Sequence, residues 1–159
     1  MDSISNKMEI DRIYAQLSPR ADLLYRFVMV YADYIYRFRD YGTGQIISML
    51  EVHMLTMIED NPGITVSELA TMWNRTKSAV SQTITKLEKK KLIYRKKSDH
   101  NAKVMHLHPT EAGIELSVKH KMYDNMDIMQ TKQELLKSCT LDEFDAFYKV
   151  LEAYCKLFE

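Results

Sequence analysis

The stretch LATMWNRTKSAVSQTITKLE, residues Leu69 to Glu88, decides the fold. Just before it, Thr65-Val66-Ser67-Glu68 has the Thr-x-x-Glu pattern of a capping box, which predicts the start of a short helix. Asn74 follows that helix, and asparagine is one of the few non-glycine residues that tolerate a left-handed backbone. A second helix is expected from about Thr76 to about Lys90, with its inner face formed by Val80, Ile84 and Leu87.

The residues after these two helices predict a β-hairpin. Residues 93–97 and 103–108 read as short strands, because Met105 and Leu107 alternate with His106 and His108 in the second of them. A polar tip at residues 98–102 joins the strands. Two short helices followed by a hairpin make a winged helix-turn-helix, and the scarcity of Gly and Pro favours a mainly α-helical chain around that β-wing.

The charge of the chain is concentrated in the same region. The whole chain has 22 basic and 22 acidic residues, but residues 75–103 hold ten basic residues and only two acidic ones. A basic block in an otherwise acidic chain is typical of a surface that faces phosphates. Judged by charge alone, an ordinary solvent-exposed charged surface explains the basic block equally well.

The outer face of the second helix carries side chains that can bind DNA. Gln82 can pair bidentately with adenine, and Lys77 can reach guanine or a phosphate. The start of the helix at Thr76 adds backbone amides for a phosphate. The residues expected to contact DNA are Thr76, Lys77, Ser78, Ser81, Gln82 and Lys86 in the helix, and Arg95, Lys97, Asn101 and Lys103 in the hairpin.

Helices are also expected on both sides of this lobe. Apolar residues at three- and four-residue spacing predict a helix from about Pro19 to Asp40, with the proline in its first turn. Capping boxes at Ser48 and Thr140 predict two more helix starts, and a helix of roughly 25 residues is expected from Thr110. These boundaries divide the chain into an N-terminal dimerisation part (1–45), a DNA-binding lobe (46–113) and a C-terminal dimerisation part (114–159).

The order and spacing of these elements resemble those of the MarR family of bacterial winged-helix regulators. The similarity runs without gaps from Leu69 to Glu88 and continues through Leu92-Ile93 and the wing to Thr110-Glu111-Ala112-Gly113. The resemblance implies six helices with a β-wing, and a homodimer in which the first, fifth and sixth helices of two chains interlock. It also implies repression at a pseudo-palindromic operator, with many members releasing DNA when a small ligand, a metal or an oxidant acts near the dimer helices.

Several positions depart from the family pattern. Lys91 stands where the family usually has Gly, and Arg75 stands where an apolar residue usually precedes the recognition helix. Asn101 and Lys103 match the wing-tip positions that often hold Asp-x-Arg, and lysine lacks the planar guanidinium that fits a narrow minor groove. No cysteine precedes Cys139, so the oxidant sensing of the family's peroxide sensors is not expected.

An effector pocket is a further hypothesis. The first long helix is rich in tyrosine and phenylalanine, and such a stripe is more often core or dimer interface. Together with the second helix it could also line an apolar pocket for a small aromatic or anionic effector. The ligand-binding candidates are Tyr31, Tyr34, Met49 and His53.

Other classes of function have little support in the sequence. His106 and His108 lie two apart on one strand without a further ligand nearby, so no metal site and no cofactor are expected. Cys139 and Cys155 read as reduced thiols. No phosphate loop, nucleophile elbow or zinc-protease helix indicates an enzyme, and no apolar run is long enough to span a membrane. A cytoplasmic location is expected.

The sequence therefore predicts a sequence-specific, double-stranded-DNA-binding transcriptional regulator, a ligand-responsive homodimeric repressor of a pseudo-palindromic operator. The alternative is a winged-helix module that binds proteins without specific DNA binding. Such a module should present exposed apolar anchors on its recognition face, where this chain has Ser, Gln, Thr and Lys.

Overall fold

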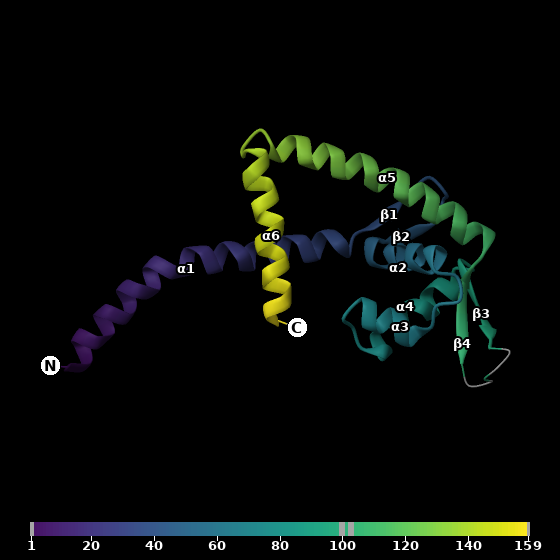
Figure 1. Cartoon of the computed structure of the whole chain (residues 1–159), viewed down its shortest axis with the longest axis horizontal. Coiled ribbons are helices and arrows are strands. Elements are labelled where there is room, and N and C mark those ends of the chain that lie inside the picture. Colours follow the sequence, from purple (N-terminus) through teal and green to yellow (C-terminus); the bar gives the residue numbers. More distant parts are fainter. Residues whose placement is uncertain (1, 99–100, 102–103, 159) are drawn as a thin grey trace.

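The computed structural model describes residues 2–98, 101 and 104–158, which form six helices and two small antiparallel sheets (Figure 1). The mainly α-helical fold with a β-wing is confirmed. The elements are α1 (Asp2–Ile35), β1 (Phe38–Asp40), β2 (Ile46–Ser48), α2 (Met49–Asp60), α3 (Val66–Met72), α4 (Lys77–Lys89), β3 (Ile93–Lys97), β4 (Met105–Pro109), α5 (Glu111–Leu135) and α6 (Leu141–Phe158).

One hydrophobic core holds the helix-turn-helix and the wing together. Leu55 and Ile58 of α2 and Leu116 of α5 are fully buried in the same cluster as the apolar face of α4. The predicted inner residues of α4, Val80, Ile84 and Leu87, are buried. Strands β3 and β4 pair from Ile93 opposite Pro109 to Lys97 opposite Met105, and Leu107 turns into the core. This shared core therefore holds α4 and the wing in a fixed position relative to each other.

The predicted capping boxes start the helices where the sequence places them. In α2 and α3, the hydroxyl of Ser48 or Thr65 accepts a hydrogen bond from the backbone N–H of Glu51 or Glu68, and each glutamate accepts one in return. Thr140 and Glu143 exchange the same pair of bonds at the start of α6. Each satisfies backbone groups that the first turn of a helix leaves unpaired.

Two non-glycine residues have left-handed backbones, and both lie at turns beside α4. Asn74 has φ of 46° in the turn between α3 and α4, as expected. Lys91, which stands at the usual glycine position of the family, has φ of 58° between α4 and β3. The chain therefore keeps the turn that the family's glycine makes, although a lysine side chain disfavours that conformation.

The predicted boundaries of the first helix were wrong. Helix α1 begins at Asp2, and Pro19 lies inside it rather than in its first turn. Ion pairs between Lys7 and Asp11 and between Glu9 and Arg12, at helical spacing, support the additional N-terminal turns.

Helix α1 also ends at Ile35 instead of Asp40, because residues 38–40 pair with residues 46–48 as the β1–β2 hairpin. The carboxylate of Asp40 accepts hydrogen bonds from the backbone N–H groups of Gly42, Thr43 and Gly44, which closes the turn. Gly42 and Gly44 both have positive φ, so the turn uses the conformational freedom of glycine.

Helices α1, α5 and α6 leave much apolar surface uncovered. The N-terminal part of α1 projects away from the rest of the chain, and α6 crosses over α1 (Figure 1). Met29 of α1 is 65% exposed, Met126 of α5 is 73% exposed and Leu157 of α6 is 74% exposed. None of the described helices combines the length and apolar character that crossing a membrane requires.

Candidate DNA-binding surface and effector cavity

Helix α4 presents the predicted contact residues on the face opposite its buried stripe. Thr76 is the N-cap, and its hydroxyl accepts a hydrogen bond from the backbone N–H of Ala79. Lys77, Ser78 and Gln82 are exposed, and Ser81 is half-buried. The free N-terminal amides of α4 therefore lie next to a row of hydrogen-bonding side chains, an arrangement suited to a phosphate and the adjacent base edges.

Two lysines of this region also approach a buried carboxylate. The side chain of Glu51 is only 5% exposed, and its oxygens lie 3.8 Å from Nζ of Lys86 and 3.6 Å from Nζ of Lys90. Lys90 donates a hydrogen bond to the carbonyl of Ile46 as well. The side chain of Lys86 is 63% exposed, so it stays at the surface while helping to balance the charge of Glu51.

The wing is tied to α4 by an ion pair. The guanidinium of Arg95 on β3 donates to the carboxylate of Glu88 on α4, with N–O distances of 3.0 Å. Lys97 and Asn101 are exposed near the wing tip. The predicted contact Lys103 lies outside the described residues. The structure thus places Arg95 beside α4, paired to Glu88, and Lys97 at the tip end of the wing.

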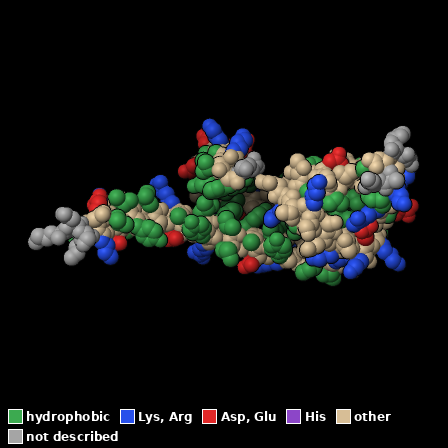
Figure 2. All heavy atoms as spheres, turned by 90° about the horizontal axis from the view of Figure 1, so that it is seen from below, with side chains coloured by type: hydrophobic (Ala, Val, Ile, Leu, Met, Phe, Trp, Pro, Cys, Tyr) green, Lys and Arg blue, Asp and Glu red, His purple; other side chains and the backbone are tan. Residues whose placement is uncertain are grey.

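Charged and apolar side chains gather in different parts of the molecule. Figure 2 shows Lys and Arg side chains distributed over the winged lobe, and hydrophobic side chains along the α1 arm and around the hollow beside α6. The basic block noted in the sequence therefore lies on the surface of the winged lobe. Most of the exposed large apolar side chains belong to α1, α5 and α6, and a few, such as Met72 and Tyr94, belong to the winged lobe.

A cavity of about 810 Å³ lies between α1, α2, α5 and α6. All four predicted ligand-binding residues line it: Tyr31 and Tyr34 from α1, and Met49 and His53 from α2. The other lining residues are Phe27, Val30, Asp124, Asp127, Ile128, Thr131, Lys132, Phe144 and Tyr148. Aromatic and aliphatic walls with a few polar groups are typical of a small-molecule site of this size.

Three potential metal ligands meet at one end of this cavity. Nε2 of His120 lies 3.3 Å from Oδ2 of Asp124, and Nε2 of His53 lies 3.6 Å from the same oxygen. One ligand atom from each residue lies within 4.8 Å of the other two. Tetrahedral zinc with nitrogen and oxygen ligands at about 2.0–2.2 Å separates its ligands by roughly 3.3–3.5 Å, so the spacing suits a metal ion.

Burial sets the protonation of this cluster. Burial, and then the nearby His53 and Lys121, lower the pKa of His120 to about 4, which leaves its imidazole neutral at neutral pH. Burial also raises the pKa of Asp124, while His53 opposes that rise. A neutral imidazole is the form that binds a metal, so His120 is prepared as a ligand.

His120 and Asp124 were not among the site residues predicted from the sequence. Their spacing of four residues on α5 was the available signal, because it places two side chains on one face of a helix. The other histidine pair that was considered does not meet at a common point: Nδ1 of His106 contacts the carbonyl of Gly63, and the ring of His108 stacks on Tyr94.

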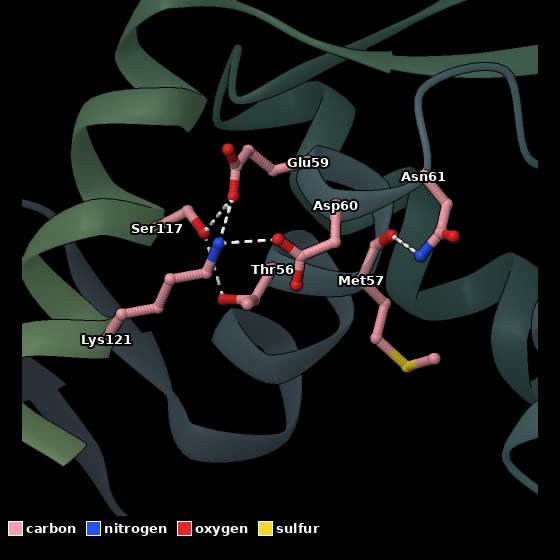
Figure 3. Close-up of polar contacts among 7 residues, drawn as sticks. All are labelled: Thr56, Met57, Glu59, Asp60, Asn61, Ser117 and Lys121. Atoms are coloured by element: carbon pink, nitrogen blue, oxygen red, sulfur yellow. Dashed lines mark hydrogen bonds and ion pairs between the residues drawn. The ribbon is translucent and has the colours of Figure 1, made fainter. Parts of the chain in front are cut away.

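A polar network joins α2 to α5 one turn away from the cluster (Figure 3). The ammonium of Lys121 lies 2.5 Å from a carboxylate oxygen of Glu59 and 2.6 Å from one of Asp60. The buried Ser117 hydroxyl donates to the carboxylate of Glu59 at 3.2 Å and lies 3.1 Å from the hydroxyl of Thr56, from which it can accept. Any change in the α2–α5 spacing at the histidine cluster therefore also changes this network.

Comparison with known proteins finds similarity to the MarR family and to a helix-turn-helix regulator. The sequence model of the MarR family matches residues 47–105, which include α2, α3, α4 and β3. The chain is 33% identical over 84 residues to YhjH of Bacillus subtilis, described as an uncharacterized HTH-type transcriptional regulator. That match covers 53% of this chain and 48% of the relative, so the chain spans about half the length of the curated relative it matches.

Solved structures share the fold over most of the chain. FabT of Streptococcus pneumoniae, solved in complex with DNA, has a TM-score of 0.64 at 21% identity, covering 91% of this chain and 96% of that one. The zinc-responsive MarR family member ZitR of Lactococcus lactis has a TM-score of 0.66 at 18% identity, covering 90% and 99%. The chain is therefore similar in sequence to the MarR family over residues 47–105, and it shares the fold of the MarR family member ZitR over most of its length.

Proposed function

We propose that this chain binds double-stranded DNA through α4 and the wing and regulates transcription. The observation that carries the proposal is the outer face of α4, where the exposed Lys77, Ser78 and Gln82 follow the free N-terminus of the helix. The DNA complex of FabT, which shares this fold, supports it. The described part of this face shows no large apolar anchor of the kind a protein-binding surface would need.

The DNA-binding unit of the proposal is a homodimer that represses from a pseudo-palindromic operator. The exposed apolar faces of α1, α5 and α6 support an interface with a second copy, because monomers seldom leave so much apolar surface in water. In this arrangement residues 46–113 form the DNA-binding lobe, and residues 1–45 and 114–159 form the dimerisation region. Two copies of α4 would then contact successive major grooves.

Selection from random duplex DNA at near-physiological salt tests this function. The expected product is a palindrome with half-sites about 10 base pairs apart. Gln82→Ala should change the base preference at one position per half-site by about 1–3 kcal/mol. Lys97→Ala is the matched control on the wing, and it should weaken binding to all sequences alike. Recovery of sequence-blind, salt-sensitive binding only would contradict specific recognition.

The cavity favours a second role, regulation by an effector. The aromatic walls would hold the small aromatic or anionic effector anticipated from the sequence, and the cluster of His53, His120 and Asp124 would hold a divalent transition metal. The zinc-responsive ZitR, with the same fold, supports a metal as effector. Because the cluster joins α2 to α5, a metal would favour one arrangement of the DNA-binding lobe against the dimer helices.

Metal titration of the operator complex tests the second role. Zn(II) or Co(II) should change the operator affinity by about fivefold or more, as a typical coupling free energy predicts. His53→Ala should abolish that change without weakening metal-free DNA binding. His108→Ala, at a histidine of the wing outside the cluster, is the matched control for metal dependence. An equal response of the native chain and His53→Ala would contradict the cluster as the metal site.

A further inference from the structure

The position of the histidine–aspartate cluster at the wall of the cavity suggests a specific class of effector. His53 and Asp124 line the cavity with side chains that are 41% and 21% exposed, whereas His120 is 1% exposed behind them. All three side chains would therefore bind an ion from the side of the protein interior, opposite the cavity. A catalytic-type zinc site likewise has three protein ligands and one open position. Here the open position faces the cavity.

The charge of the cavity depends on whether that ion is present. Its lining includes the carboxyl groups of Asp124 and Asp127 and one ammonium group, that of Lys132. The hydroxyl of Tyr34 donates to the carboxylate of Asp127 at 2.9 Å. Among the lining side chains, carboxyl groups therefore outnumber cations by two to one, and a further cation, the guanidinium of Arg39, lies against the Tyr34 ring, 4.6 Å from its centre. A divalent ion would make the same wall net positive.

The remaining walls suit an apolar body. Phe27 stacks on Tyr31, and Tyr31 stacks on Tyr34, so three adjacent rings form one side of the cavity. Phe144 and Tyr148 of α6 face the same space. Nζ of Lys132 lies 5.3 Å from the centre of the Phe144 ring, which leaves a cation beside the apolar wall. A molecule with an aromatic or aliphatic body and one anionic end fits these surroundings.

We propose that the cavity binds an apolar carboxylate together with the metal, with one carboxylate oxygen displacing water from the open position of the ion. The inference rests on the proposed metal site of His53, His120 and Asp124. It deepens that role by making the two effectors interdependent, because the metal supplies the positive charge that the cavity lacks. By linkage, the carboxylate also strengthens metal binding by the same factor.

Cobalt spectroscopy of the full-length protein tests the proposal, with 1-naphthoate as the probe. Co(II) alone should first give the visible spectrum of a protein-bound ion, and its absence would count against the metal site itself. Addition of 1-naphthoate to the Co(II) protein should then change that spectrum. Calorimetry should show naphthoate binding to the Co(II) protein about tenfold or more tightly than to the metal-free protein.

Variants and a neutral probe separate the two parts of the proposal. Tyr31→Ala should weaken naphthoate binding to the Co(II) protein about tenfold while leaving Co(II) affinity without naphthoate unchanged, since truncating a packed aromatic removes apolar contacts. Tyr25→Ala, on the same helix but outside the cavity lining, should change neither. The uncharged 1-naphthalenemethanol should not respond to Co(II). A bound Co(II) whose spectrum is insensitive to naphthoate, or equal naphthoate affinity with and without Co(II), would overturn the inference.

Discussion

At the scale of single residues, two backbone positions hold the wing against the helices. Lys91 has a left-handed backbone, and the hydroxyl of Thr110 donates to its carbonyl. Gly113 lies so close to Leu92 that a Cβ added there would be 2.0 Å from the Leu92 carbonyl oxygen. There is therefore no room for a further side-chain atom where the end of α4 meets the starts of β3 and α5.

Replacement of Lys91 by glycine should stabilise the protein by about 0.5–1 kcal/mol, because glycine adopts positive φ without the steric cost that other residues have. Chemical denaturation measures the free energy of unfolding. Lys91→Ala is the control, since it removes the same charge and keeps the strain, and its stability should stay close to that of the native chain. Equal stabilisation by both changes would assign the effect to charge instead of backbone conformation.

Gly113→Ala should destabilise the protein by about 1–3 kcal/mol, the usual range for overpacking a well-packed site. The new methyl group would meet the backbone of Leu92 and the side chain of Leu55, and the backbone has little room to move. Glu115→Ala, at an exposed position of the same helix, should change the free energy of unfolding only slightly. A Gly113→Ala protein as stable as the control would show that α5 shifts freely against β3.

These residues also show what a sequence can predict. The capping boxes at Ser48, Thr65 and Thr140 depend on side chains three positions apart, so local spacing was sufficient to place three helix starts. The histidine–aspartate cluster depends on α2 packing against α5. The contact between His53 and His120 spans 67 positions, and no local pattern reports such a distance.

At the scale of elements, the ion pair between Arg95 and Glu88 connects the wing to the recognition helix. The carboxylate of Glu88 pairs with the guanidinium of Arg95, one of the proposed DNA contacts. The pair therefore holds the wing against α4 and occupies a cation that the proposed DNA complex would use.

Glu88→Gln should strengthen DNA binding and make it more sensitive to salt. The change removes a negative charge from the surface and frees the guanidinium of Arg95, so the slope of log K against log salt should become steeper by about one unit. Titrations of labelled duplex at several salt concentrations measure that slope. Glu111→Gln makes the same charge change at the start of α5 and should leave the slope nearly unaltered, whereas an unchanged slope in Glu88→Gln would mean that Arg95 does not reach the DNA.

The start and end of helix α1 and the β1–β2 hairpin were not predicted correctly from the sequence. Residues 6–17 are exposed in one chain, and the helix start was predicted at Pro19 because proline is favoured in the first turn of a helix. The three-residue strands β1 and β2 are too short to produce an alternating pattern. Gly42 and Gly44 marked the turn between them, but the strands themselves form through backbone pairing that side chains do not encode.

At the scale of the whole molecule, the exposed faces of α1, α5 and α6 predict that assembly contributes to stability. Leu157→Glu should weaken the proposed dimer and lower operator affinity, because it puts a charge on the exposed apolar face of α6. Light scattering measures the mass in solution, which should fall from twice that of one chain toward that of one chain. Lys149→Gln changes the charge of α6 by the same amount at an exposed polar position and should remain dimeric.

Because α5 is long, a small tilt about one end of the helix moves the other end by a larger distance. Helix α5 has 25 residues, and its start packs closely against Leu92. Its middle carries the histidine–aspartate cluster and the Lys121 network, and its far end leads to α6. At 1.5 Å per residue it is about 37 Å long, so a tilt of about 5° about one end moves the other by about 3 Å. A change of a few tenths of an ångström between α2 and α5, near the start of the helix, would therefore become a larger displacement at its far end, and in the proposed dimer that displacement would alter the spacing of the two DNA-binding lobes.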